Sequence, residues 1–238
     1  MPFSQRRPVP SQTKPCGLSK SHRIVLGGVA FIPDLSGALY CPDFKALLVA
    51  DLHLEKASSL ARRGVHLPPY DTRETLSQLK AVVSDVKPER LIFLGDSFHD
   101  DEAMDRISDQ DREALSEISS SAECVWIAGN HDGALQGASL TANLGPVTLR
   151  HIPEPIEDGA YEIAGHYHPA AAIVQRGRRV RRKCFAANGE RILMPAFGSF
   201  TGGLSVGSMA ISVLFPDDHD VYLLGGTAIH KVPSSRAM

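Results

Sequence analysis

Three short apolar runs recur in the first part of the chain, at residues 45–50 (KALLVA), 90–95 (RLIFLG) and 124–129 (CVWIAG). Each run is continuous rather than alternating and is rich in β-forming residues, which is typical of strands buried on both faces. Helical patterns separate the runs. This alternation predicts an α/β fold with a largely parallel sheet and right-handed crossovers.

Two segments between these runs have helical periodicity. Residues 71–86 begin with Asp71 and Glu74 in capping-box spacing, which predicts an amphipathic helix. Its apolar face would consist of Leu76, Leu79, Val83 and Val86. Residues 101–120 predict a second, more polar helix, whose inward side chains would be Ile107, Leu115 and Ile118.

Beyond about residue 145 the pattern changes, because apolar runs now follow one another with Gly, Pro or Asn between them. The runs are VTLRH, YEIAGHYH, AAIVQR, KCFAAN, RILMPAF, MAISVLF and DVYLLGG. They have the features of strands and hairpins without intervening helices. A second, mostly antiparallel sheet is therefore expected to complete the domain.

The remaining composition is that of an ordinary globular protein. With 238 residues and 43% hydrophobic residues, the chain can fill a substantial core. Residues 1–22 are rich in Pro, Ser and basic residues and lack a signal-like apolar stretch, so we expect a flexible arm followed by one domain at residues 23–238. The four cysteines are scattered and no run is long enough to span a membrane, which favours a cytoplasmic protein.

Polar residues with metal-binding chemistry come directly after five of the predicted strands. They are Asp51, His53, Asp96, Asn130, His131, His151, His166 and His168. Each could separately cap a helix or begin a turn, and an isolated Asp-x-His pair carries little information. However, ligands of α/β sheets bind beyond the carboxyl ends of strands, and Asp, Asn and neutral His suit manganese, iron or zinc. The set therefore favours one shared metal site.

The motifs D-x-H (51–53), G-D (95–96), G-N-H-D (129–132) and G-H-x-H (165–168) resemble those of the calcineurin-like metallophosphoesterases. The resemblance implies a four-layer α-β-β-α sandwich of two mixed sheets, with the site at the carboxyl ends of strands. The stretch LMPAFGSFTGG (193–203) is similar to bacterial ligase-associated DNA damage response phosphodiesterases of the PdeM type.

The same resemblance implies the ligands of two divalent cations, with Mn²⁺ expected and Fe or Zn as alternatives. The first cation would take Asp51, His53, Asp96 and His168. The second would take Asp96, Asn130, His151 and His166, so that Asp96 bridges the pair. His131 would lie near the leaving oxygen of the substrate, and Asp132 would orient its ring.

Several further residues have two interpretations. Glu55 stands where this subfamily usually has Gly, and we expect it at a helix N-terminus, pointing to solvent. His99 could contact substrate or support a metal ligand, or be a simple loop residue. Arg178, Arg179, Arg181 and Arg182 belong to a basic run that could follow a nucleic-acid backbone or be a solvated hairpin. Phe200 could stack on a base or be part of a tight turn.

Together these features predict a dinuclear-metal phosphodiesterase or nuclease acting on single-stranded or damaged DNA, in DNA repair. The family resemblance also implies a functional association with a DNA ligase, a helicase and an exonuclease. The ligands alone would equally suit a phosphatase or a nucleotide pyrophosphohydrolase of the same fold, which is the alternative. A net charge of −2 gives no overall electrostatic preference for nucleic acid.

Overall fold

The computed structural model describes residues 22–132, 137–175 and 177–237. The arm expected at residues 1–22 therefore lies outside the described residues except for its last member, His22. The His22 ring is held at the domain surface, where its Nε2 lies 2.9 Å from the carbonyl oxygen of Ile229.

The first sheet contains the three strands expected from the continuous apolar runs. These are β4 (Ala46–Val49), β5 (Arg90–Leu94) and β6 (Glu123–Ile127), and they are parallel neighbours. Three further strands, not predicted from the sequence, extend this sheet in antiparallel fashion in the order β1-β2-β3-β4. They are β1 (Ile24–Leu26), β2 (Val29–Pro33) and β3 (Leu39–Cys41). The first sheet is therefore mixed.

The second sheet has the strand order β14-β13-β11-β12-β9-β8-β7, with β10 paired to β11. Its strands are β7 (Thr141–Leu144), β8 (Val147–Arg150), β9 (Tyr161–Ala164), β10 (Ala170–Gln175), β11 (Arg178–Ala187), β12 (Arg191–Leu193), β13 (Asp220–Leu224) and β14 (Ile229–Pro233). Strands β8, β9 and β12 are parallel and the other pairs are antiparallel, so this sheet is also mixed.

The prediction of one strand in this region was wrong. The run MAISVLF forms the short helix α5 (Met209–Ser212) and the turns after it. Only Ile211 of this helix is buried, in a cluster that also contains Phe215. An apolar run of this length does not distinguish a strand from a buried helical turn.

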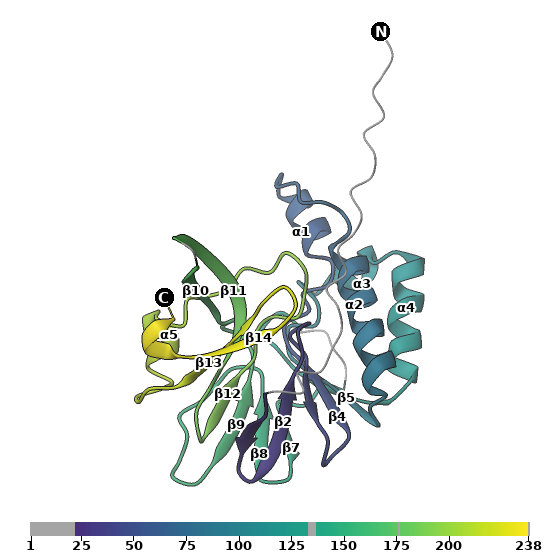
Figure 1. The fold of residues 1–238 in the computed structure, drawn as a ribbon. Coiled ribbons are helices and arrows are strands. Elements are labelled where there is room, and N and C mark those ends of the chain that lie inside the picture. Colours follow the sequence, from purple (N-terminus) through teal and green to yellow (C-terminus); the bar gives the residue numbers. More distant parts are fainter. Residues whose placement is uncertain (1–21, 133–136, 176, 238) are drawn as a thin grey trace.

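The first sheet is covered by helices on one face (Figure 1). Helix α2 (Asp71–Val86) has the predicted bounds, whereas the helix expected at residues 101–120 is divided into α3 (Ala103–Arg106) and α4 (Asp109–Ser120). The division occurs because the Ser108 hydroxyl accepts the Asp111 N–H at 3.2 Å and begins α4 anew. A further short helix, α1 (Lys56–Arg62), follows β4.

The capping box expected at Asp71 and Glu74 is not formed. The N-cap of α2 is Tyr70, and Asp71 lies inside the helix. The Asp71 carboxylate instead accepts the N–H of Ala57 at 2.8 Å, at the beginning of α1. This side chain therefore joins two helices rather than capping one.

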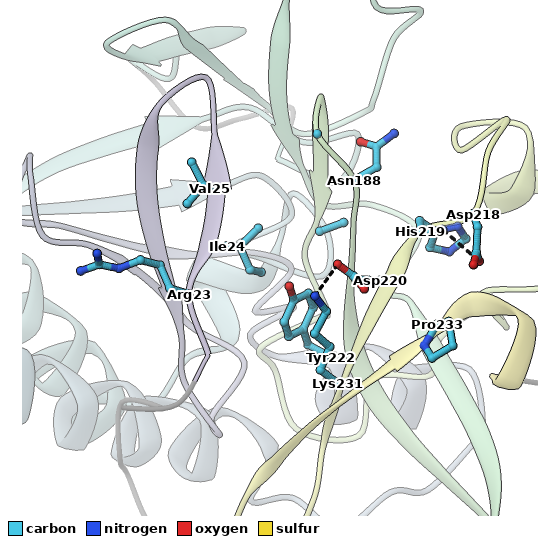
Figure 2. A pocket seen from close by; sticks show the side chains of 12 residues that line it. Arg23, Ile24, Val25, Asn188, Asp218, His219, Asp220, Tyr222, Lys231 and Pro233 are labelled. Carbon is cyan, nitrogen blue, oxygen red and sulfur yellow. Dashed lines mark hydrogen bonds and ion pairs between the residues drawn. The ribbon is translucent and has the colours of Figure 1, made fainter.

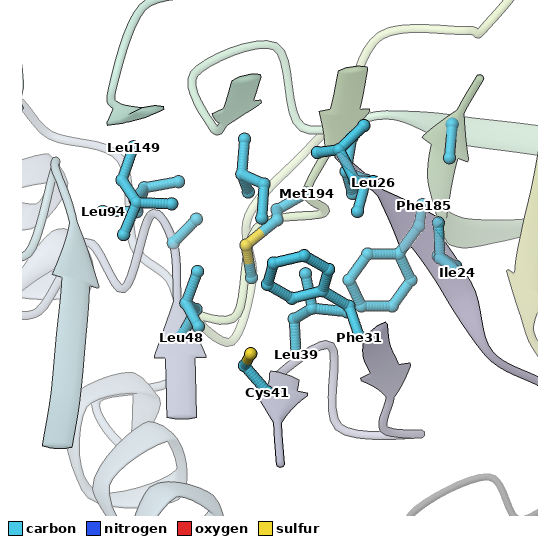
Figure 3. Close-up of a cluster of buried hydrophobic side chains, with 14 of the residues drawn as sticks. Ile24, Leu26, Phe31, Leu39, Cys41, Leu48, Leu94, Leu149, Phe185 and Met194 are labelled. Carbon is cyan, nitrogen blue, oxygen red and sulfur yellow. The ribbon is translucent and has the colours of Figure 1, made fainter. Parts of the chain in front are cut away.

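Three apolar clusters hold the layers together. The largest lies between the two sheets, where Phe31, Leu48 and Leu94 meet Phe185 and Leu149 (Figure 3). The second packs α2 and α4 on the first sheet, and the third covers the outer face of the second sheet. Within the described residues, the cover of that outer face is α5, irregular chain and the 3₁₀ turn η1 (Ser234–Arg236), so the second helical layer expected of an α-β-β-α sandwich consists here of short elements only.

Candidate metal centre

The suspected metal ligands meet at one end of the two sheets. Asp51 and His53 follow β4, Asp96 follows β5, His151 follows β8, and His166 and His168 follow β9. Six of them form two groups in which all the ligand atoms lie within 4.8 Å of one another. The sequence had placed these residues at strand ends, and the packed sheets bring the ends together.

The first group consists of Asp51, His53 and His168. His168 Nε2 lies 3.0 Å from Asp51 Oδ1 and 3.4 Å from His53 Nε2. Asp51 and His53 are buried, whereas the side chain of His168 is 19% exposed. The group therefore has one open side from which a ligand can enter.

The second group consists of Asp96, His151 and His166. His151 Nε2 lies 3.3 Å from Asp96 Oδ2, 3.2 Å from His166 Nδ1 and 3.1 Å from the Asn130 side-chain oxygen. Asn130, which sequence reasoning had also assigned to this site, is thus in place. Four polar side chains converge on one point.

Asp96 connects the two groups. Its Oδ2 lies 3.3 Å from His151 Nε2 in one group and 3.9 Å from His53 Nε2 in the other. Its Oδ1 accepts the backbone N–H of His131 at 2.9 Å. One oxygen is therefore fixed by the backbone while the other faces both groups, as a shared ligand must.

The donor set fits two divalent cations. Asp51 and Asp96 are 0% and 2% exposed, and carboxylates with so little access to water are normally paired with cations. The imidazole nitrogens that face each other at 3.2 and 3.4 Å can share a cation between their lone pairs. Oxygen and imidazole ligands without thiolates suit manganese, iron or zinc.

The protonation states favour metal binding by most of these side chains. Burial lowers the pKa of His53 to about 3 and also lowers the pKa of His166. Burial opposes ionisation of Asp96, but its contacts with His151 and the His131 N–H outweigh it, so that its pKa is about 2. Neutral imidazoles and an ionised carboxylate are the forms that bind metals.

His151 is oriented by the backbone. Its Nδ1 lies 3.1 Å from the carbonyl oxygen of Leu94, which can only accept a hydrogen bond, so Nδ1 carries the proton. In the neutral ring the lone pair is therefore on Nε2, which faces Asp96. Burial opposes protonation of His151, but its contacts with Asp96 and Asp51 outweigh it and raise its pKa, so a cation bound here would displace the Nε2 proton. Such a backbone contact fixes both the tautomer and the direction of a metal-binding histidine.

The backbone of the site is strained. Asp51, His53, Asp96, His166 and His168 have positive φ angles of 54°, 46°, 47°, 68° and 47°. The left-handed conformation costs roughly 1–2 kcal/mol per residue for side chains other than Gly. Strain of this kind persists where surrounding structure enforces it, and it is typical of functional sites.

The glycines of the motifs lie in close contact with the ligands. A Cβ atom at Gly95 would lie 2.4 Å from the His151 ring, and one at Gly129 would lie 2.2 Å from Asp96 Oδ1. A Cβ atom at Gly165 would lie 2.7 Å from Asp51 Oδ2. The motifs therefore require glycine because the ligands occupy the space of a side chain.

Replacement of Gly129 by Ala is expected to lower metal-dependent hydrolysis of an aryl phosphodiester by about 10–100-fold, the loss that follows when the support of a metal ligand is disturbed. The new methyl group would displace Asp96. Gly189→Ala is the matched control, because no atom lies within 4 Å of a Cβ there. Steady-state rates and metal content measured for both variants check this, and equal activity would contradict it.

His131 lies at the open side of the centre. Its side chain is 43% exposed, and its Nε2 is 4.0 Å from Asp96 Oδ2. The ring is stacked on that of His99 at 5.7 Å between centroids, and it meets the His53 ring edge-on at 5.5 Å. His131 is therefore beside the candidate cations and accessible to a substrate.

Asp132 does not orient the His131 ring through a hydrogen bond in the described residues. Its carboxylate accepts the backbone N–H groups of Ser97, Phe98 and Gly129 at 3.1, 3.0 and 3.2 Å. These contacts join the loop after β5 to the loop after β6. Asp132 therefore fixes the two loops that present Asp96 and His131.

His99 lies next to the candidate metal centre and is not simply an exposed loop residue. Its ring stacks on His131 and lies 5.6 Å from that of His53. Burial lowers the pKa of His99, and its Nδ1 has no hydrogen-bond partner among the residues that the structure describes. A neutral imidazole at this place can contact a substrate or support His131.

From its place at a helix N-terminus, Glu55 was expected to point to solvent, but its side chain is buried. It is 8% exposed, and its carboxylate accepts hydrogen bonds from Ser58 at 2.6 Å and Thr72 at 2.9 Å. The expectation was wrong because Thr72 comes from another helix, α2, which the local sequence does not show. Glu55 therefore links α1 to α2.

The segment at residues 196–203 lies against the ligand loops. Phe197 N–H donates to the carbonyl of Ala50 at 2.8 Å, and a Cβ atom at Gly198 would lie 2.0 Å from the carbonyl oxygen of Leu52. Phe197 is buried, whereas Phe200 is 45% exposed with a positive φ of 55°. The two phenylalanines thus have different positions, one in the core and one at the surface.

Arg178, Arg179, Arg181 and Arg182 are all exposed on β11. Lys183, which was not among the predicted site residues, supports the loop beside the ligands. Its Nζ donates to the carbonyls of Ala196 and Gly198 at 2.8 and 2.7 Å. In the sequence, Lys183 could have been singled out by its position directly before the buried run CFAA, where a side chain is partly enclosed.

A separate pocket of about 510 Å³ lies beside β13 and β14 (Figure 2). Two of its charged groups form an ion pair, since Lys231 Nζ lies 2.8 Å from Asp220, and a third, Asp218, accepts a hydrogen bond from the Ser234 hydroxyl. His219, also in its lining, stacks on Phe215 at 4.3 Å between ring centroids. We therefore place the chemistry at the strand ends and not in this pocket.

The sequence of residues 44–189 matches the model of the calcineurin-like phosphoesterase family, which is more than half of the chain. The chain belongs to this family, and it is a metal-dependent phosphoesterase with two candidate metal sites. Among the described residues, no helix has both the length and the apolar composition needed to cross a bilayer.

Two solved structures give particular comparisons. The chain is similar to the nuclease MPE of Pseudomonas putida, with 29% identity and a TM-score of 0.67 over 88% of this chain and 99% of that one. It also matches Yfce, a phosphoesterase from E. coli, at 15% identity and a TM-score of 0.42, over 79% of this chain and 97% of that one. A comparison with curated proteins gave no match.

Proposed function

We propose that this phosphoesterase hydrolyses phosphodiester bonds of DNA, in single-stranded or damaged form, with two divalent cations of which Mn²⁺ is the expected metal. The observation that carries the proposal is the pair of ligand groups faced by Asp96, in a fold similar to that of a nuclease over 88% of the chain. A dinuclear centre of this kind suits in-line displacement at phosphorus.

The seven ligands would be divided as the family resemblance implies, with Asp51, His53 and His168 on one cation, Asn130, His151 and His166 on the other, and Asp96 shared. When bound, the two cations supply activation of a water molecule and neutralisation of the phosphate oxygens. Asp96 would hold the two positions at a fixed separation.

His131 would act on the leaving oxygen. It is 43% exposed and close to Asp96, so a phosphate seated on the cations would lie within its reach. The imidazole can donate a proton to the departing alkoxide or stabilise its charge. Asp132 would keep the His131 loop in place through the backbone N–H groups that it accepts.

The PAFGSFTGG stretch supports assignment of this chain to the ligase-associated DNA damage response phosphodiesterases. Gly198 lies against Leu52, and a Cβ atom at Gly203 would lie 2.1 Å from the carbonyl oxygen of His168. This stretch therefore shapes the surroundings of two ligand loops. We further propose a role in DNA repair and a functional association with a DNA ligase, a helicase and an exonuclease.

The test is a substrate panel with Mn²⁺ that compares an aryl phosphodiester, an aryl phosphomonoester and labelled single- and double-stranded DNA. We expect hydrolysis of the diester and cleavage of DNA, with the single strand preferred. Rapid hydrolysis of the monoester without cleavage of either DNA would instead support the phosphatase or pyrophosphohydrolase alternative.

A further inference from the structure

The hairpin of β10 and β11 extends beyond the sheet at the end of the molecule from which α1 also projects (Figure 1). Its strands are antiparallel, and the basic residues lie on β11. Successive side chains of a strand point to opposite faces, so the basic run must be divided between two surfaces. The two surfaces differ in what lies beside them.

The two faces can be identified from the buried half of β11. Phe185 and Ala187 pack in the core between the sheets, whereas Cys184 and Ala186 pack in the cluster on the outer face. By alternation, Lys183, Arg181 and Arg179 continue the inner face, and Arg182 and Arg178 continue the outer face.

Contacts of the side chains agree with this assignment. Lys183 reaches the loop at residues 196–201, where it donates to Ala196, Gly198 and Thr201. Arg181 Nη2 donates to the carbonyl oxygen of Gly203 at 2.5 Å. Both inner side chains thus lie along the segment that borders the metal ligands.

The outer arginines face elsewhere. Arg182 is directly opposite Ala171, whose side chain belongs to the outer cluster. Its described side-chain hydrogen bond goes to the carbonyl of Arg181 at 3.1 Å, within its own strand. Arg178 has the same parity and is exposed at the tip.

The inner face is also close to the reacting centre. A Cβ atom at Gly203 would lie 2.1 Å from the carbonyl oxygen of His168, and one at Gly198 would lie 3.1 Å from that of Asp51. One residue from each of two ligand loops, those that follow β4 and β9, is therefore in contact with the segment that Arg181 and Lys183 hold. No such contact is described for Arg178 or Arg182.

Exposed apolar side chains accompany the inner arginines. Val174 is 60% exposed and directly opposite Arg179, so it shares the inner face. Phe200 and Leu204, which flank the Gly203 contact, are 45% and 42% exposed. Cations next to an exposed aromatic side chain, here Phe200, are characteristic of surfaces that bind single strands by backbone contacts and base stacking.

We propose that the inner face of the hairpin, formed by Arg179, Arg181 and Val174 together with Phe200, binds the single-stranded nucleic acid that flanks the scissile phosphate. Arg178 and Arg182 take no direct part. This inference rests on the proposed function, since it names the surface on which the substrate of that site continues. Arg179 and Arg181 are two residues apart and thus about 6.8 Å apart along the strand, so they can contact different phosphates.

The test compares two double variants with the same change of charge. Arg179→Ser with Arg181→Ser removes the inner pair, and Arg178→Ser with Arg182→Ser removes the outer pair. We expect the inner variant to lower kcat/KM for a labelled single-stranded oligonucleotide at least about tenfold and to reduce its dependence of log(kcat/KM) on log[salt] by about 1.4, which is about 0.7 for each lost single-strand phosphate contact. The outer variant should change kcat/KM less than threefold.

Hydrolysis of an aryl phosphodiester, which is too small to reach the hairpin, should be unchanged in the outer variant and in the single variant Arg179→Ser. Loss of Arg181 also removes its hydrogen bond to Gly203, so the double variant changes more than charge. The single variants Arg179→Ser and Arg178→Ser therefore form a second pair. No side-chain hydrogen bond of Arg178 or Arg179 is found in the described part of the chain. Equal losses from inner and outer variants, or no loss from the inner ones, would overturn the one-sided surface.

Two further results would test the single-strand assignment and the proposed function separately. Equal losses on a duplex and on the single strand would overturn the single-strand assignment. A wild-type enzyme that hydrolyses the aryl diester but no oligonucleotide would overturn the proposed function itself, and that failure is visible before any variant is compared.

Discussion

Replacement of Asp96 by Asn is expected to lower hydrolysis of both DNA and an aryl phosphodiester by well over 100-fold, because even residues that only support metal ligands cost 10–100-fold when lost. Asp96 Oδ2 lies 3.3 Å from His151 Nε2 and 3.9 Å from His53 Nε2, so its charge serves both groups. An amide at this position leaves the two cations without a shared anion. Elemental analysis should show fewer than two metals per chain.

The fold should survive this change. The Asn side-chain oxygen can still accept the His131 N–H that Asp96 accepts now at 2.9 Å. Asp85→Asn, at an exposed position of α2, makes the same change of charge away from the site and is the control. If Asp96→Asn kept two metals and normal turnover while Asp85→Asn behaved like wild type, Asp96 would not be the shared ligand.

Replacement of His131 by Ala is expected to leave both metals bound but to lower kcat on DNA by roughly 10²–10⁴-fold, the usual contribution of a positioned acid or base. The loss should be smaller on an aryl phosphodiester, since an aryl oxide leaves without needing a proton. His131 is suited to this role because its ring is 43% exposed beside the centre and belongs to neither ligand group.

His66→Ala, at an exposed histidine outside the site, is the control for loss of an imidazole. The decisive measurement is the ratio of kcat values on the two substrates. The same loss on both, or an unchanged rate on DNA, would contradict a role at the leaving oxygen.

The strand ends explain why the centre could be anticipated from the sequence. The continuous apolar runs that became β4, β5 and β6 are local signals, and a ligand that directly follows such a run is placed by the sheet itself. Asp51 and Asp96 are examples. The resemblance to a known family then supplied the division of the ligands between two cations, which spacing alone does not reveal.

Features set by distant contacts were not predictable in the same way. Glu55 and Asp71 have the sequence context of helix N-termini, yet their carboxylates bind Thr72 and the Ala57 N–H across two helices. The run that became α5 has no period that distinguishes it from a strand. In each case the deciding partner lies on another element.

The basic run shows a third limit. Its composition favours an anion-binding surface but does not tell which side chains share a face, because that depends on where the alternation begins. The register of β11 settles it, since Phe185 points into the core between the sheets and Arg181 has the same parity. Only two of the four predicted arginines, Arg179 and Arg181, then share the face on which Arg181 contacts Gly203.

The most direct test of a dinuclear phosphodiesterase is metal reconstitution. The protein is stripped of metal with a chelator, and cleavage of a labelled single-stranded oligonucleotide is followed as Mn²⁺ is added in known equivalents. We expect no cleavage without metal and activity that reaches its plateau only at two equivalents per chain. Full cleavage by the stripped protein, or a plateau at one equivalent, would contradict the two-metal centre at Asp96.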